Sequence, residues 1–178
     1  MSDPSSFFLA HRNRILEASR RGLLVDLACG RGRHCIAAAE TGAHVIGVDR
    51  NGSFLAALRH AAQERHLRVE CVRADLERDY GLPLLAGSCA AIFVFRFLYR
   101  PLAAAIEAAL QPGGLLLYET FTRDQATLAG GPRNPAFLLE AGELPQLFPN
   151  LEVLATWEGI TEGERPSAIA RLAARKPA

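Results

Sequence analysis

Residues 23–33 read LLVDLACGRGR, an apolar run that breaks into a glycine turn, and residues 45–49 read VIGVD, a second apolar run that ends in a carboxylate. A parallel strand followed by such a turn leaves bare main chain against which a ligand can lie, because Gly30 and Gly32 can adopt backbone angles that other residues avoid. Asp49, at the end of the second strand, can accept hydrogen bonds from both hydroxyls of a ribose. The two strands together indicate an adenosine-containing cofactor.

The details of the turn decide between cofactors. A dinucleotide-binding fingerprint reads G-x-G-x-x-G, and its third glycine allows helix and strand to pack closely beneath a pyrophosphate. This chain has Cys35 at that third position, preceded by Arg33 and His34. The bulky residues disfavour NAD, and an NAD(P)-dependent oxidoreductase stays open only as a weaker alternative.

The turn resembles motif I of the class I S-adenosylmethionine (SAM)-dependent methyltransferases, in which an acidic residue and two small or apolar residues precede C/G-G-x-G. Asp26, Cys29, Gly30 and Gly32 match that pattern. The sequence LQPGGL at residues 110–115 resembles the L-x-P-G-G turn before the fifth strand of the same superfamily. The resemblance implies SAM as the cofactor, S-adenosylhomocysteine as the product, and no metal.

The second half of the chain carries a narrower resemblance. FLYRPL at residues 97–102, YETF at 118–121 and NPAFLL at 134–139 are similar to a group of small bacterial methyltransferases related to the tellurite-resistance methyltransferases. CGRGR at residues 29–33 resembles their C-G-x-G-R. This resemblance implies the cofactor far better than it implies the acceptor of the methyl group.

Short apolar segments alternate with helical ones along the chain, which predicts an α/β fold with right-handed crossovers. The expected strands are Leu23–Leu27, Ala43–Val48, Leu67–Val72, Ala90–Phe95, Gly114–Glu119, Leu151–Glu158 and Ser167–Ala174, with Gly159–Pro166 joining the last two. The expected helices run from Ser5 to about Arg21 and over Arg33–Thr41, Ser53–Arg65, Leu102–Leu110 and Gly142–Phe148. With the resemblance, this implies a Rossmann-like, doubly wound, seven-stranded sheet that is mostly parallel, with a C-terminal antiparallel hairpin and helices on both faces.

Length and composition bound the class of protein. The 178 residues, 49% of them hydrophobic, suit one domain. We expect an N-terminal lid or packing helix over residues 1–22, a cofactor-binding core over 23–120, and a substrate-side loop and hairpin over 121–178. The 20 basic and 19 acidic residues nearly balance, so no overall field favours nucleic acid or an anionic membrane. Without a secretory signal, a membrane-length span or C-x-x-C spacing, we expect a cytoplasmic protein with reduced thiols.

The tips of the first four strands should surround one pocket, because ligands of open α/β sheets bind beyond the carboxyl ends of the strands. The expected cofactor-binding residues are Asp26, Ala28, Cys29, Gly30, Gly32, Arg33, Asp49, Arg50, Ala74, Asp75 and Phe95. The resemblance places Ala74 and Asp75 at the adenine edge. Asp26 should order the glycine turn from beneath, since a carboxylate in an apolar strand needs hydrogen bonds. Asp49 as a helix N-cap and Asp75 as a solvated turn residue are the alternative interpretations.

The sequence constrains the residues that would bind the methyl acceptor less than those that would bind the cofactor. A sulfonium donor carries its own leaving-group activation, so a general base is optional and no catalytic residue is assigned. Arginines can gather an anionic acceptor, and a carboxylate can take a proton from a neutral one. Glu119 can alternatively pair with Arg123 or Arg133. The candidate acceptor-site residues are Arg96, Arg100, Glu119, Arg123 and Arg133, and the candidate lid residues are Phe7, Phe8, His11 and Arg12.

These patterns favour a methyltransferase that acts on a small-molecule acceptor, such as a soft anion or a thiol-like group. A large polymer would require an open face or an added recognition domain, and the chain shows no basic face for nucleic acid. A SAM-binding regulatory module without catalytic activity is the alternative, because no single residue is indispensable to the chemistry.

Overall fold

The structure is a computed structural model that describes residues 3–78, 81–163 and 166–178. Its strands are β1 (Leu23–Leu27), β2 (Val45–Asp49), β3 (Val69–Arg73), β4 (Cys89–Phe95), β5 (Leu110–Phe121), β6 (Glu152–Ile160) and β7 (Ala168–Arg175). The α-helices are α1 (Ser6–Ala10), α2 (Arg12–Ser19), α3 (Arg33–Ala39), α4 (Gly52–Glu64), α5 (Ala103–Ala109) and α6 (Glu143–Gln146). Three 3₁₀ segments complete the assignment: η1 (Arg100–Leu102), η2 (Arg123–Thr127) and η3 (Pro135–Phe137).

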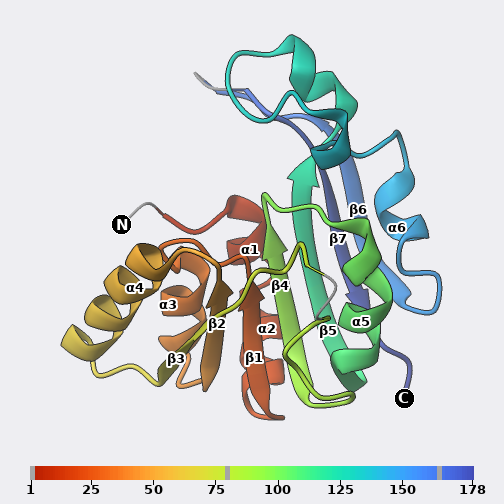
Figure 1. The fold of residues 1–178 in the computed structure, drawn as a ribbon. Helices are drawn as coiled ribbons and strands as arrows, with labels where there is room; N and C mark the ends of the chain where they lie inside the picture. Colours follow the sequence, from red (N-terminus) through yellow and green to blue (C-terminus); the bar gives the residue numbers. More distant parts are fainter. Residues whose placement is uncertain (1–2, 79–80, 164–165) are drawn as a thin grey trace.

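The seven strands form one sheet in the order β3-β2-β1-β4-β5-β7-β6 (Figure 1). The first five strands pair in parallel, and β7 runs antiparallel between β5 and β6. All seven residues of β4 are buried, as expected for a central parallel strand. The predicted fold, mostly parallel with a C-terminal antiparallel hairpin, is confirmed. The direction in which successive strands are added to the sheet reverses between β1 and β4. A ligand site is expected at this switch point, beyond the carboxyl ends of the strands.

Helices cover both faces of the sheet, as predicted. Phe8, Ile15 and Leu58, from α1, α2 and α4, belong to one cluster of buried side chains. Ile106 and Leu144, from α5 and α6, belong to the other. Among the described residues no helix is both long and apolar enough to cross a bilayer.

The N-terminal helix differs from the prediction, because two helices replace one. The break lies at His11, whose backbone departs from helical angles and whose ring lies edge-on to Phe7 with ring centroids 4.8 Å apart. The break lets both helices bury apolar side chains in the same cluster. Residues 1–2 of the expected N-terminal segment and 164–165 of the expected hairpin connection lie outside the described residues.

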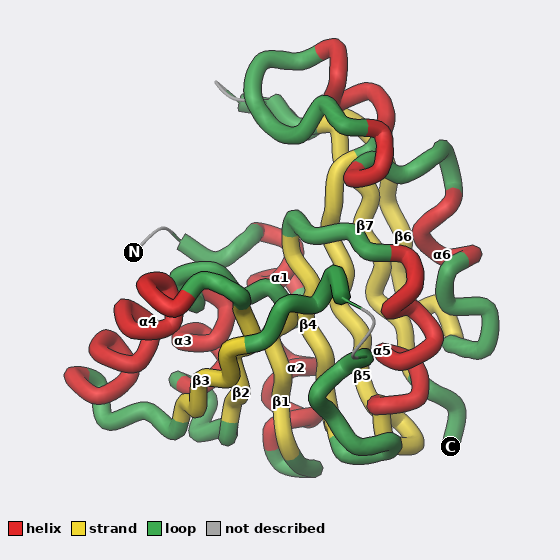
Figure 2. Tube along the Cα trace, in the orientation of Figure 1, coloured by secondary structure: helices red, strands yellow, loops and turns green. Residues whose placement is uncertain are grey.

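Strands β5 and β7 extend beyond the end of β4 and carry residues 122–142 above the sheet (Figure 1). This segment, the upper loop, is mostly irregular and includes η2 and η3 (Figure 2). Phe121, Leu138 and Ile169 form a small apolar cluster at its base. The upper loop therefore has its own packing against the extended strands.

Candidate functional site

The turn after β1 is built from left-handed backbone. Ala28, Gly30 and Gly32 have φ values of 54°, 56° and 80°. A β-carbon on Gly32 would stand 2.3 Å from Cδ1 of Leu58, so only glycine fits there. A β-carbon on Gly30 would meet nothing within 4 Å, so the main chain at Gly30 faces open space. The turn thus presents bare backbone to a ligand, as glycine turns in this type of sheet do.

Asp49 ties the end of β2 to this turn. Its Oδ2 accepts a hydrogen bond of 2.8 Å from the Gly30 amide, and its Oδ1 accepts one of 2.8 Å from the Asn51 amide. The N-cap interpretation of Asp49 is wrong, because the Asn51 side chain caps α4 by accepting from the amides of Ser53 and Phe54. A carboxylate has about four acceptor positions, so Asp49 keeps further lone pairs for a ligand.

A small cavity of about 110 Å³ opens beside Asp49. It is lined by Ala28, Asp49, Arg50, Ala74, Asp75, Leu76, Glu77 and Phe97. Five of these are expected cofactor-binding residues, and Leu76, Glu77 and Phe97 were missed. Asp75 also orders its own turn, because its Oδ1 accepts from the Glu77 amide at 3.1 Å. Arg50 pairs with Glu77 at 2.9 Å on the rim.

A larger cavity of about 470 Å³ shares Ala28 with the small one. It is lined by Asp26, Ala28, Cys29, Gly30, Arg31, Gly32, Arg33, His34, Phe54, Phe95 and Arg96. Arg31 and Phe54 were missed, and their contact closes one side, with the guanidinium 5.0 Å from the centre of the ring. The position of Arg31 between Gly30 and Gly32 was the sequence signal that could have identified it as a cavity residue.

The larger cavity carries an excess of positive charge. Burial raises the pKa of Asp26 to about 7, and the partner of its Oδ2 is the thiol of Cys35 at 3.3 Å, on α3 rather than in the glycine turn. Burial and the nearby charge of Arg96 lower the pKa of Arg33. The lining of the cavity therefore contains three arginines, Arg31, Arg33 and Arg96, and one carboxyl group, that of Asp26, whose pKa is raised.

His34 is a neutral packing residue. Burial, followed by the charges of Arg33 and Arg96, lowers its pKa to about 3. Its ring stacks on Phe95 with centroids 3.9 Å apart, and its Nε2 accepts a hydrogen bond of 3.1 Å from the Ser5 amide. The side chain has no proton-accepting nitrogen to spare for a substrate in this arrangement.

Glu119 lies in a row of residues that crosses the sheet at one level: Phe95, Glu119, Arg171 and Trp157. Its carboxylate is buried, and Oε2 accepts from Arg171 Nε and from Ser5 Oγ, each at 2.9 Å. The expected pairing of Glu119 with Arg123 or Arg133 is wrong. The antiparallel register of β7 supplies Arg171 instead, and the glutamate also anchors the start of α1.

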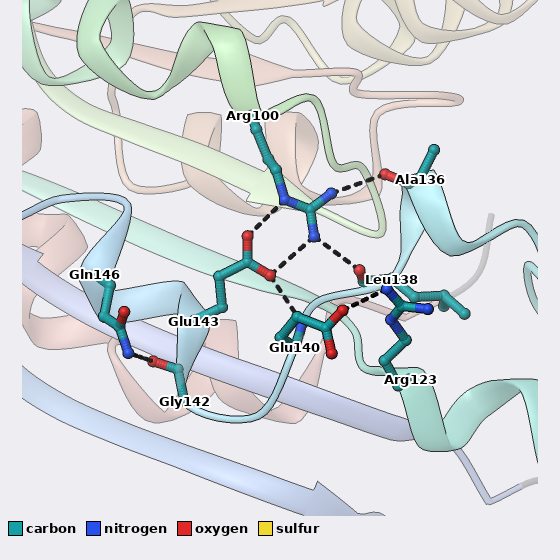
Figure 3. A network of polar contacts seen from close by, with 8 residues as sticks. All are labelled: Arg100, Arg123, Ala136, Leu138, Glu140, Gly142, Glu143 and Gln146. Carbon is teal, nitrogen blue, oxygen red and sulfur yellow. Dashed lines mark hydrogen bonds and ion pairs between the residues drawn. The ribbon is translucent and has the colours of Figure 1, made fainter.

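The expected acceptor arginines separate in space. Arg96 lines the larger cavity, with its guanidinium 4.9 Å from the centre of the Phe121 ring. Arg100 instead pairs with Glu143 and donates to the carbonyl oxygens of Ala136 and Leu138, which pins the upper loop (Figure 3).

The other two arginines belong to the upper loop. Arg123 pairs with Glu140 in the network of Figure 3, and Arg133 is exposed. Neither they nor Arg100 line the larger cavity. The structure therefore brings only Arg96 of the four to the described wall of that cavity.

The candidate lid residues lie mostly inside the molecule. Phe7, Phe8 and His11 are buried, whereas Arg12 is exposed. The Phe8 ring packs 6.1 Å from Phe95, centre to centre. Helix α1 thus forms part of the wall behind the larger cavity in this structure.

Comparison with known proteins places the fold. A model of a methyltransferase domain matches residues 24–114, and no curated protein was found to match the chain. Among solved structures, the chain is similar to TehB from Haemophilus influenzae (19% identity, TM-score 0.74, covering 92% of this chain and 62% of that one). It is equally similar to an S-adenosylmethionine-dependent methyltransferase from Mesorhizobium loti (19%, 0.74, covering 97% and 99%). The [4+2]-cyclase SpnF also matches (18%, 0.72, covering 95% and 81%).

The structural matches establish the fold, and the chain spans less than two thirds of the TehB chain. The family model covers half of the chain, including the glycine turn, β2 and β4. A nicotinamide-dependent oxidoreductase is thereby excluded as the family. The chain belongs to the class I SAM-dependent methyltransferases.

Proposed function

We propose that this protein transfers the methyl group of SAM to a small anionic acceptor, such as a thiolate or another soft anion, bound beside Arg96. The observation that carries the proposal is the charge of the larger cavity, where three arginines face one carboxyl group whose pKa is raised. Arginines bind and orient anions through several N–H donors at once.

The two cavities, which share Ala28, fit the chemistry of SAM. In the proposed arrangement Asp49 accepts hydrogen bonds from the ribose hydroxyls, and Ala74 and Asp75 border the adenine in the small cavity. Arg33 and the backbone at Gly30 hold the aminoacyl end in the larger one. The open space at Gly30 supports this fit, because no side chain blocks the approach of a ligand to the main chain there.

When bound, SAM supplies an activated methyl group. The side chains then have to align the acceptor, hold its charge and exclude water. Phe95, with Phe8 of α1 packed against it, gives the cavity an apolar wall. Arg96 is the residue placed to hold an anionic acceptor next to Phe95.

Three titratable groups near Phe95 are committed to other contacts, and the Asp26 carboxyl group of the same cavity is hydrogen-bonded to the Cys35 thiol, which favours an acceptor that arrives already ionised. His34 stays neutral and is hydrogen-bonded to Ser5. Glu119 is committed to Arg171 and Ser5. Burial raises the pKa of Tyr118, whose hydroxyl donates to the Phe97 carbonyl at 3.1 Å. None of these three groups is poised to remove a proton from a neutral alcohol or amine.

The test is release of S-adenosylhomocysteine with a panel of thiols, carboxylates, alcohols and amines. We expect turnover with thiols, increasing with pH as the thiol ionises. Arg96→Gln should raise the KM for the acceptor about tenfold or more, which is the loss of one charge-assisted hydrogen bond. Arg133→Gln, on the exposed upper loop, is the matched control and should leave KM unchanged.

Two outcomes contradict the proposal. Preferential turnover of neutral alcohols or amines would overturn the anionic acceptor. Saturable binding of S-adenosylhomocysteine without turnover of any acceptor would instead favour the regulatory module.

A further inference from the structure

We propose that Cys29 and Cys35 form a redox-sensitive dithiol under the glycine turn, and that its oxidation to a disulfide by a small-molecule disulfide weakens cofactor binding. The proposal rests on the proposed cofactor site. It concerns the reactivity of two thiols, which methyl transfer does not use, and the buried carboxyl group of Asp26 beside them.

The two sulfur atoms lie close to the same glycine. A β-carbon on Gly47 of β2 would stand 3.0 Å from the Sγ of Cys29 and 3.0 Å from the Sγ of Cys35. Both cysteines are free thiols and buried. Both sulfurs therefore border the space left by the missing side chain of Gly47, and the proposal requires them to close within it to the roughly 2.0 Å of a disulfide.

The two thiols differ in access. Cys29 lines the larger cavity and is 8% exposed, whereas Cys35 lies behind it with no exposed surface. An incoming small disulfide therefore meets Cys29 first. Cys29 gives up its thiol proton to water, its sulfur attacks the small disulfide to form a mixed disulfide, and the small thiolate that leaves takes up a proton.

Cys35 is placed to complete the exchange. Its sulfur attacks the Cys29 sulfur of the mixed disulfide, and the second small thiolate leaves. The Cys35 proton passes to Asp26 Oδ2, which already accepts its hydrogen bond at 3.3 Å. Burial raises the pKa of Asp26 to about 7, so this carboxyl group can both take and return a proton near neutral pH. In total two protein thiols are oxidised, and one small disulfide is reduced to two thiols.

The cross-link acts directly on the turn. The Cys29 amide donates to the Val48 carbonyl at 3.0 Å, and its carbonyl accepts from the Gly32 amide at 2.9 Å. Drawing Cys29 toward α3 strains these bonds and moves Gly30, while Asp26 loses its thiol donor. A cofactor held by that backbone must therefore bind more weakly to the oxidised protein.

The test combines peptide mapping with calorimetry. The full chain is equilibrated with 2-hydroxyethyl disulfide and 2-mercaptoethanol, its Cys29–Cys35 cross-link is measured by mass spectrometry, and its affinity for S-adenosylhomocysteine is measured before and after. We expect a cross-link that dithiothreitol reverses and a loss of affinity of about tenfold or more. By linkage, saturating S-adenosylhomocysteine should shift the thiol–disulfide equilibrium toward the thiols by the same factor.

Four variants give the controls. Cys29→Ala and Cys35→Ala should each lose the cross-link and the sensitivity of binding to oxidation. Cys71→Ala and Cys89→Ala should retain both, because neither cysteine is part of the pair. A cross-link to Cys71, no cross-link, or a cross-link that leaves binding unchanged would each overturn the proposal. Failure of the reduced wild type to bind S-adenosylhomocysteine would instead count against the proposed cofactor site.

Discussion

Arg171 is the cation that compensates a buried carboxylate, and replacing it should destabilise the protein strongly. Its Nε donates to Glu119 at 2.9 Å, and the glutamate side chain is only 2% exposed. The guanidinium also lies between two rings, 5.7 Å from the centre of Phe7 and 5.0 Å from that of Trp157. Arg171→Met keeps much of the apolar stem but leaves the Glu119 charge without its cation.

The magnitude follows from that burial. Removing one partner of a buried ion pair costs about 3–5 kcal/mol, because the remaining charge stays out of water. For a chain of this size the loss corresponds to a melting temperature about 10 °C lower. The matched control is Arg175→Met on the same strand, since Arg175 pairs with Glu152 at 2.7 Å but both side chains are about half exposed. An exposed pair of this kind contributes about 0–1 kcal/mol.

Urea denaturation followed by the fluorescence of Trp157, the single tryptophan, measures both variants. The double variant Glu119→Gln/Arg171→Met should regain part of the lost free energy of unfolding, because no charge is left buried. Equal destabilisation by Arg171→Met and Arg175→Met would refute the reasoning, as would a double variant less stable than Arg171→Met alone.

Three further predictions concern Asp26 in β1, Gly47 in β2 and the upper loop. Because burial raises the pKa of Asp26 to about 7, the folded state binds this proton more tightly than the unfolded state, and stability falls from about pH 4 to about pH 7 by on the order of 4 kcal/mol. Urea titrations across that range should show a shallower decline for Asp26→Asn, and an unchanged decline would contradict the assignment. Gly47→Ala should cost about 1–3 kcal/mol in the same assay, since its β-carbon would lie 2.8 Å from Leu58 Cδ2, and a neutral effect would disprove the close packing. Arg100→Met should expose the upper loop to limited proteolysis by removing its ion pair with Glu143, and unchanged cleavage would argue against that role.

The strands were predictable because their apolar runs are continuous. Strand β4 matched its prediction almost to the residue, since all of its side chains are buried and the sequence contrast is sharp. The expected start of β2 was two residues early, because the strand begins where Val45 pairs with Val69 of β3. The break at His11 was not predictable from helical periodicity, since it follows from the docking of two short helices on one core.

The parts of the site that depend on strand order could also be predicted. Asp49 and Ala74 lie on one cavity because the carboxyl ends of neighbouring parallel strands meet. Contacts that depend on the antiparallel pairing of β7 with β5 could not be predicted. The ion pair of Glu119 with Arg171 is one of them, and it joins residues 52 positions apart. The commitment of Arg100 to Glu143 likewise depends on how the upper loop closes. The binding roles of the cavity residues stay predictions.

The central claim is that this chain holds SAM with Asp49 on the ribose. Calorimetric titration of S-adenosylhomocysteine into the wild type, Asp49→Asn and Asp124→Asn tests it most directly, because Asp124 is an exposed carboxylate on η2 and serves as the matched control. We predict micromolar binding to the wild type and to Asp124→Asn, about −8 kcal/mol. Asp49→Asn should bind about 100-fold more weakly, through the loss of charge-assisted hydrogen bonds. No binding to the wild type, or equal binding to all three proteins, would contradict the account.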